Sequence, residues 1–154
     1  MTVNVVFVCL GNICRSPMAE AVFQQMVNEA GLSDKIAVDS SGTGSWHKGE
    51  QAHQGTRQIL AKHNIPYNGR SRQVTQNDMD PNNYVVAMDD SNIRNLKNRF
   101  GTHPRLYRLL DFAQNSNVRN VPDPYYTDNF DYVYQLVTDG CAGLLEKIRT
   151  ENNL

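Results

Sequence analysis

The chain opens with an almost unbroken apolar run, VNVVFVC, over residues 3–9. Such a run is typical of a strand in a parallel sheet, where both faces are covered. From residue 18 to residue 30 the apolar positions recur at helical spacing, which predicts an amphipathic helix. Pro17 suits the first turn of this helix and Gly31 suits its end. The pattern therefore predicts a strand that leads through a short polar loop into a helix.

The rest of the chain continues this alternation. Residues 36–40, 84–88 and 105–110 are expected to form strands, and residues 54–63, 130–149 and the segment from DDSN through Arg99 to form helices. Residues 65–83 and the segment VPDPYYTDN are predicted to be loops because proline and glycine interrupt them. Strands alternating with helices predict one α/β domain over residues 1–154, with a parallel sheet and helices on both faces. Its ligand site is expected at the carboxyl ends of the strands.

Composition narrows the function. The 154 residues carry a net charge of -1, so we expect no general attraction to nucleic acid or to an anionic membrane. We find no bilayer-spanning run and no export signal, which favours a cytoplasmic protein. The three cysteines, Cys9, Cys14 and Cys141, are too few and too scattered for a disulfide framework, so free thiols are expected.

The loop CLGNICRS after the first strand has the composition of an anion site. Backbone N–H groups converge where a strand turns into a helix, and the helix dipole adds positive potential there. Gly11 and Asn12 tolerate the positive φ that such a loop needs, and Arg15 offers a planar fork for two phosphate oxygens. A thiol in this position loses its proton easily, so Cys9 is a candidate nucleophile beneath a phosphate cradle.

These residues also have simpler interpretations than a catalytic site. Cys9 alone would more often be a buried structural cysteine, but its spacing to Arg15 between a strand and a helix is more specific. The loop lacks the glycine-lysine pattern of nucleotide-binding phosphate loops. Metal binding is not predicted, because Cys9 and Cys14 lack CxxC spacing and the four histidines form no ligand pair.

The segment VCLGNICRSPMAE resembles the phosphate loop of the low-molecular-weight protein tyrosine phosphatases. VDSSGTGSWHKG, SRQVT, VVAMDDSN and VPDPYY also match that family in order, so the resemblance covers residues 3–149. It implies a three-layer α/β/α fold with a central four-stranded parallel sheet, and the phosphate loop between the first strand and first helix. It also implies a phosphatase that needs neither metal nor cofactor and hydrolyses phosphotyrosine and small aryl phosphates through a cysteinyl-phosphate.

The resemblance assigns a role to individual residues. Cys9 would be the nucleophile, Arg15 the phosphate-binding arginine and Asp123 the acid that protonates the leaving group. The loop and its supports would comprise Leu10, Gly11, Asn12, Ile13, Cys14, Ser16, Ser40 and Asp89. Aromatic walls for the substrate ring would come from Trp46, Tyr125 and Tyr126.

Two positions leave questions open. Gly69 stands where many family members carry a histidine that supports Asn12, so the support of Asn12 is in doubt. Cys14 is either a small buried filler or a partner that forms a reversible disulfide with oxidised Cys9. Cys141, on the last predicted helix, is expected to be structural.

Other activities fit less well. Arsenate reductases of the thioredoxin-coupled type need a further cysteine pair, and only Cys141 remains here. Protein arginine phosphatases typically carry threonine where this chain has Ile13, and they lack the paired tyrosines. A binding module without catalysis is not favoured, because Cys9, Arg15 and Asp123 are all present. The expected partners are tyrosine-phosphorylated proteins, with a bacterial tyrosine kinase as one candidate, and the chain is expected to be a monomer or weak dimer.

Overall fold

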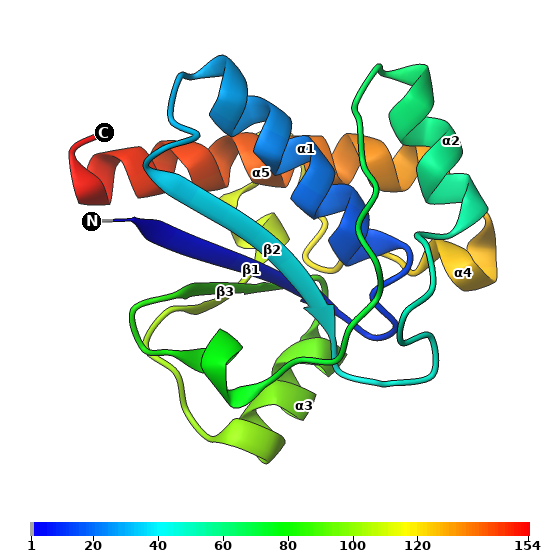
Figure 1. The fold of residues 1–154 in the computed structure, drawn as a ribbon, viewed down its shortest axis with the longest axis horizontal. Helices are drawn as coiled ribbons and strands as arrows, with labels where there is room; N and C mark the ends of the chain where they lie inside the picture. Colours follow the sequence, from blue (N-terminus) through cyan, green and yellow to red (C-terminus); the bar gives the residue numbers. More distant parts are fainter. Residues whose placement is uncertain (1) are drawn as a thin grey trace.

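A computed structural model describes residues 2–154. Its centre is a four-stranded sheet in the order β2-β1-β3-β4, in which every neighbouring pair is parallel (Figure 1). The strands are β1 (Val3–Cys9), β2 (Ile36–Gly42), β3 (Tyr84–Ala87) and β4 (Leu106–Arg108). The predicted α/β fold with a central four-stranded parallel sheet is therefore confirmed.

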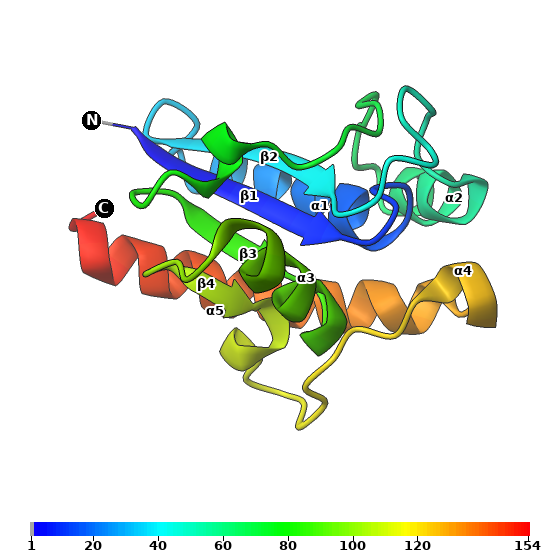
Figure 2. The same ribbon diagram turned by 90° about the horizontal axis from the view of Figure 1, so that it is seen from below.

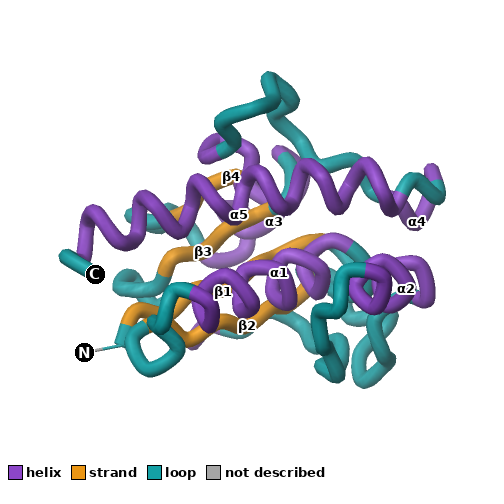
Figure 3. The backbone as a smooth tube through the Cα atoms, turned by 90° about the horizontal axis from the view of Figure 1, so that it is seen from above, coloured by secondary structure: helices purple, strands orange, loops and turns teal. Residues whose placement is uncertain are grey.

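Five α-helices are described in residues 2–154: α1 (Arg15–Glu29), α2 (Gln54–Lys62), α3 (Asp90–Phe100), α4 (Pro124–Thr127) and α5 (Phe130–Asn152). Two short 3-10 turns, η1 (Gln76–Met79) and η2 (Leu109–Phe112), lie between them. Helices α1 and α5 pack side by side (Figure 3). No helix of residues 2–154 has the length and apolar character needed to cross a membrane.

Alternating residues of β1 face two different hydrophobic cores, one on each side of the sheet. Phe7 and its neighbours two positions away, Val5 and Cys9, face a core shared with α1 and α5. Val6 and Val8 face a smaller core that includes Leu96 of α3. Figure 2 shows α3 in front of the strands, with α1 and α5 behind them. The strand is apolar except at Asn4 because the sheet is covered on both sides.

Several predicted boundaries were wrong, and tertiary contacts explain them. Helix α1 begins at Arg15, three residues before the apolar periodicity, with Pro17 in its first turn as predicted. The fourth strand is only three residues long, because residue 105 lies in a turn and η2 takes residues 109 and 110. VPDPYYTDN is not a loop throughout, because Asp123 caps the short helix α4 through the Tyr125 backbone N–H.

Helix α5 passes without a break through Gly140 and Gly143 and ends at Asn152. A Cβ at Gly143 would come within 1.8 Å of the Phe112 carbonyl oxygen, and one at Gly140 within 2.6 Å of Leu109. Both glycines therefore allow η2 to lie directly against the helix, which outweighs their low helix propensity.

The carboxyl ends of the strands gather the segments that matter for function. Figure 1 shows the tips of β1 and β2 at the end of the molecule where the chain enters α1, α2 and α4. Cys9 ends β1, and its register partner on β2 is Gly42. The Val121 backbone N–H donates to the Met88 carbonyl, which ties the segment before α4 to the end of β3.

Candidate active site

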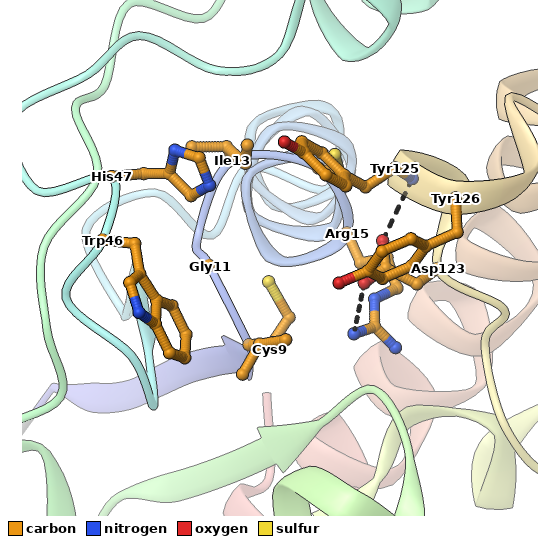
Figure 4. A pocket seen from close by; sticks show the side chains of 11 residues that line it. Cys9, Gly11, Ile13, Arg15, Trp46, His47, Asp123, Tyr125 and Tyr126 are labelled. Carbon is orange, nitrogen blue, oxygen red and sulfur yellow. Dashed lines mark hydrogen bonds and ion pairs between the residues drawn. The ribbon is translucent and has the colours of Figure 1, made fainter.

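Cys9 lies at the bottom of a hollow, where β1 turns into the loop before α1 (Figure 4). The residue is buried, but its sulfur has two polar neighbours. The Sγ atom lies 3.0 Å from the Ser16 hydroxyl oxygen, and the Asn12 backbone N–H donates to it at 3.3 Å. A thiolate accepts hydrogen bonds, so both contacts suit a sulfur that carries negative charge.

Asn12 holds the loop in a left-handed backbone conformation, with φ of 55°. Its side-chain amide donates to the hydroxyl oxygens of Ser16 at 2.7 Å and Ser40 at 3.0 Å, and its carbonyl accepts from the Arg72 backbone N–H at 3.0 Å. A non-glycine residue at positive φ is strained. These three hydrogen bonds connect the strained residue to α1, to β2 and to the segment before η1.

The support of Asn12, left open by Gly69, continues through two residues that sequence reasoning missed. The Ser40 hydroxyl donates to the Glu20 carboxylate at 2.6 Å, and the Tyr67 hydroxyl donates to the same oxygen at 2.9 Å. A Cβ on Gly69 would lie 2.4 Å from the Tyr67 hydroxyl, so glycine leaves room for this ring. Tyr67 thus contacts the carboxylate that holds Ser40, and burial raises the pKa of Glu20.

Arg15 is buried at the start of α1 and is surrounded by acceptors. One of its terminal nitrogens donates to the Asp89 carboxylate at 2.5 Å and to the Val121 carbonyl at 3.0 Å. The other lies 3.5 Å from Asp123. Burial acts to lower the pKa of Arg15, but the negative charge of Cys9, Asp89 and Asp123 raises it above its ordinary value. The guanidinium is therefore a fixed cation beside the thiol.

Asp123 lies at the mouth of the hollow, at the N-terminus of α4. One of its oxygens accepts from the Tyr125 backbone N–H at 3.1 Å, and the other faces Arg15, as the dashed lines in Figure 4 show. Pro124 follows directly and is buried, so the carboxylate is presented by a stiff turn. It lies between the arginine and the solvent, where a leaving group would be protonated.

The hollow measures about 360 Å³ and has aromatic walls. Trp46 and Tyr126 lie on opposite sides of Cys9 in Figure 4 and are mostly exposed, at 70% and 75%. The full lining is Cys9, Leu10, Gly11, Ile13, Cys14, Arg15, Trp46, His47, Asp123, Tyr125 and Tyr126. The remaining predicted site residues, Asn12, Ser16, Ser40 and Asp89, stand behind this lining and hold it.

His47 belongs to the lining but was not predicted. Its Nδ1 lies 3.1 and 3.2 Å from the two carboxylate oxygens of Glu50, and its ring stands against Gly11 of the loop. The signal was present, because His47 follows Trp46 directly in a glycine-punctuated segment. A histidine and a glutamate three residues later contact each other only where the chain turns between them, as it does between His47 and Glu50.

The other two cysteines differ from Cys9. Burial, together with the negative charge of Cys9 and Asp123, raises the pKa of Cys14 to about 12. Burial alone raises the pKa of Cys141, which lies fully enclosed on α5. All three thiols are free. Within residues 2–154, no cluster of three or more histidine, cysteine, aspartate or glutamate side chains is arranged to hold a metal ion.

A strand-loop-helix that places a buried cysteine and an arginine at the start of a helix has the features of an anion-binding thiol site. Residues 4–154 match the family described as low molecular weight phosphotyrosine protein phosphatase. The chain belongs to this family of phosphoric monoester hydrolases, as its resemblance predicted.

The similarity to known relatives extends over nearly the whole chain. It is 46% identical to the low molecular weight protein-tyrosine-phosphatase YfkJ of Bacillus subtilis, covering 99% of both chains, and the YfkJ crystal structure superposes with a TM-score of 0.94, covering 99% of this chain and 98% of that one. PtpA of Staphylococcus aureus is 47% identical, with 99% and 97% covered. A solved drosophila arginine phosphatase is 29% identical with a TM-score of 0.86, covering 94% and 97%.

Proposed function

We propose that this protein hydrolyses phosphotyrosine in proteins, and small aryl phosphates, through a cysteinyl-phosphate on Cys9. The observation that carries the proposal is the position of the Cys9 sulfur between the Ser16 hydroxyl and the Asn12 N–H, beneath the paired guanidinium of Arg15. A nucleophile, a phosphate cradle and an acid thus meet in one hollow. No step of this scheme calls for a metal ion.

In the first step the Cys9 thiolate attacks phosphorus, and the bond from phosphorus to the tyrosine oxygen breaks. The backbone N–H groups of residues 10–15 and the Arg15 guanidinium bind the phosphoryl oxygens. Stabilising the negative charge on these oxygens is the main requirement of phosphoryl transfer. Asp123 donates its proton to the leaving phenolate. The site therefore stabilises the developing charge and positions the reacting groups, and no further reagent takes part in this step.

In the second step water attacks the phosphorus of the cysteinyl-phosphate. Asp123, now ionised, takes a proton from the water, and the sulfur leaves as thiolate. Ser16 donates to that sulfur: its own oxygen already accepts from the Asn12 amide at 2.7 Å, and the Cys9 sulfur at 3.0 Å is a nearer acceptor than the Ser41 carbonyl at 3.4 Å. Asn12, Ser40 and Asp89 act by positioning the loop and Arg15.

The aromatic walls of the hollow favour tyrosine phosphate as the substrate. The thiol lies deep, and the mouth is bordered by Trp46, Tyr125 and Tyr126, which can stack on a phenyl ring that reaches downward. Phosphoarginine is a second substrate to test, since one relative carries that activity in its name. Ile13 and the paired tyrosines argue for the aromatic ester.

The test is a turnover assay with a phosphotyrosine peptide, a phosphoarginine peptide and arsenate with a thiol reductant. Chelator is present throughout and Cys9→Ser serves as the blank. We expect phosphotyrosine hydrolysis that survives chelator and disappears in the variant. A preference for phosphoarginine would reassign the substrate, and normal turnover by Cys9→Ser would refute the mechanism. Tight phosphate binding without any hydrolysis would make the protein a binding module.

A further inference from the structure

A second hollow, of about 510 Å³, opens beside the catalytic one. The two share Ile13, His47 and Tyr125, which follow one another along one rim of the site in Figure 4. The far wall of the second hollow comes from the turn before α2, from α2 itself and from residue 70. A polypeptide whose phosphotyrosine enters the catalytic hollow can therefore place a neighbouring side chain across this rim.

The second hollow has an excess of positive charge. Arg57 of α2 and Arg70 both line it, and neither forms an ion pair with a carboxylate within residues 2–154. The Arg57 Nε donates to the Ala52 carbonyl at 2.9 Å, which holds this guanidinium at the wall. Glu50 is the one carboxylate of the lining, and it is engaged by His47 at 3.1 Å.

We infer that this hollow, the arginine subsite of Arg57 and Arg70, binds an aspartate or glutamate side chain next to the phosphotyrosine of the substrate. The inference rests on the proposed phosphotyrosine hydrolysis. A guanidinium matches a carboxylate in shape and charge, and two guanidinium groups without a carboxylate partner line this one hollow. With a net charge of -1, the protein as a whole does not attract acidic peptides, so the attraction is local.

The reach of a peptide fits this arrangement. An extended chain advances about 3.3–3.6 Å per residue, so a side chain one to three positions from the phosphotyrosine spans the shared rim. Small aryl phosphates end within the catalytic hollow and cannot contact Arg57 or Arg70. The subsite therefore affects peptide selection and leaves hydrolysis of small esters unchanged. Because both arginines are exposed, salt weakens the contribution.

The experiment compares four substrates: a phosphotyrosine peptide with glutamines on both sides, versions with glutamates only before or only after the phosphotyrosine, and p-nitrophenyl phosphate. Each is assayed with the wild-type protein, with Arg57→Gln/Arg70→Gln, and with Arg94→Gln/Lys97→Gln. The last variant removes the same charge from the exposed face of α3, away from both hollows.

We expect one of the glutamate peptides to show a kcat/KM roughly fivefold above the glutamine peptide at low salt, as exposed charge contacts allow. The preference should vanish in Arg57→Gln/Arg70→Gln, remain in the α3 variant and shrink at high salt, with p-nitrophenyl phosphate unchanged. If the wild type hydrolyses the esters but shows no preference for glutamate peptides, the subsite is refuted. An equal loss of the preference in both variants would refute it as well. Failure of the wild type on every ester would refute the proposed function itself, and the subsite with it.

Discussion

Arg15 and Asp89 form an ion pair at 2.5 Å although they are separated by 74 residues of sequence. The other Asp89 oxygen accepts from the Asn92 backbone N–H and so caps α3. The carboxylate thus anchors the Arg15 guanidinium to the start of a helix on the opposite face of the sheet. Asp89, expected from the sequence as a support of the loop, thus both caps α3 and contacts Arg15.

Asp89→Asn separates these two roles, because asparagine caps helices as well as aspartate does. We expect α3 to remain intact and kcat/KM to fall at least about tenfold, since the buried Arg15 loses its closest countercharge. Steady-state kinetics and thermal unfolding measure the two effects. Asp90→Asn is the control, because it neutralises the neighbouring carboxylate, which pairs with Arg108 and accepts from the Asn120 amide but does not contact Arg15, and it should leave kcat/KM unchanged.

Asp123→Asn should slow hydrolysis most for esters with poor leaving groups. A general acid contributes on the order of 10²–10⁴-fold when the leaving phenolate is basic and little when it is not. The measurement is kcat across a series of substituted phenyl phosphates. Asp128→Asn, at the end of α4 with φ of 59°, is the matched control, because asparagine tolerates this backbone. Equal losses for good and poor leaving groups would count against the acid role of Asp123.

Tyr67→Phe removes one of the two hydroxyls that hold the Glu20 carboxylate. We expect kcat to fall roughly two- to tenfold, as the loss of one hydrogen bond from a connected set allows, with little change in KM. The rate of Cys9 alkylation by iodoacetate at a fixed pH should change as well, because Ser40, Asn12 and Ser16 connect Glu20 to the sulfur. Tyr107→Phe, in β4, should change neither quantity.

Alkylation of the native protein at pH 7.5 should modify Cys9 and spare Cys14. With its pKa raised to about 12, Cys14 is thiolate in fewer than about one molecule in ten thousand at that pH. Mass spectrometry after iodoacetamide measures the two sites. The same pKa predicts that peroxide-driven formation of a Cys9–Cys14 disulfide becomes faster as the pH rises. Modification of Cys14 at a rate comparable with Cys9 would contradict this.

Asp78 should contribute stability only at higher pH. Burial acts to raise its pKa, but the Arg72 ion pair and the hydrogen bonds from Thr75 outweigh burial and lower it. A lowered pKa means that the contribution is complete above the unfolded value of about 3.9 and is lost as the pH falls through the folded value. Asp78→Asn should reduce the free energy of unfolding by about 1–2 kcal/mol at pH 7. Urea titrations should show this difference shrinking below about pH 4.

Local patterns predicted much of the fold. The first strand was found at its observed bounds, Val3–Cys9, because a two-sided apolar strand has a continuous signal. The ends of the other elements were less predictable. Residues 105–110 carry a strand-like composition, yet η2 takes the last two of them, because Gly140 and Gly143 of the distant α5 make room for a turn there.

The sequence by itself determined the chemistry of the site. Cys9, the loop and Arg15 lie within seven residues of each other, and a strand that turns into a helix brings their groups together wherever it occurs. Only the tertiary structure decided what surrounds this loop. Glu20 and Tyr67 meet beneath Ser40, His47 enters the lining and Asp89 and Asp123 close on Arg15. These contacts join segments that no short periodicity relates, and parallel strands bring them to one edge only when the sheet has formed.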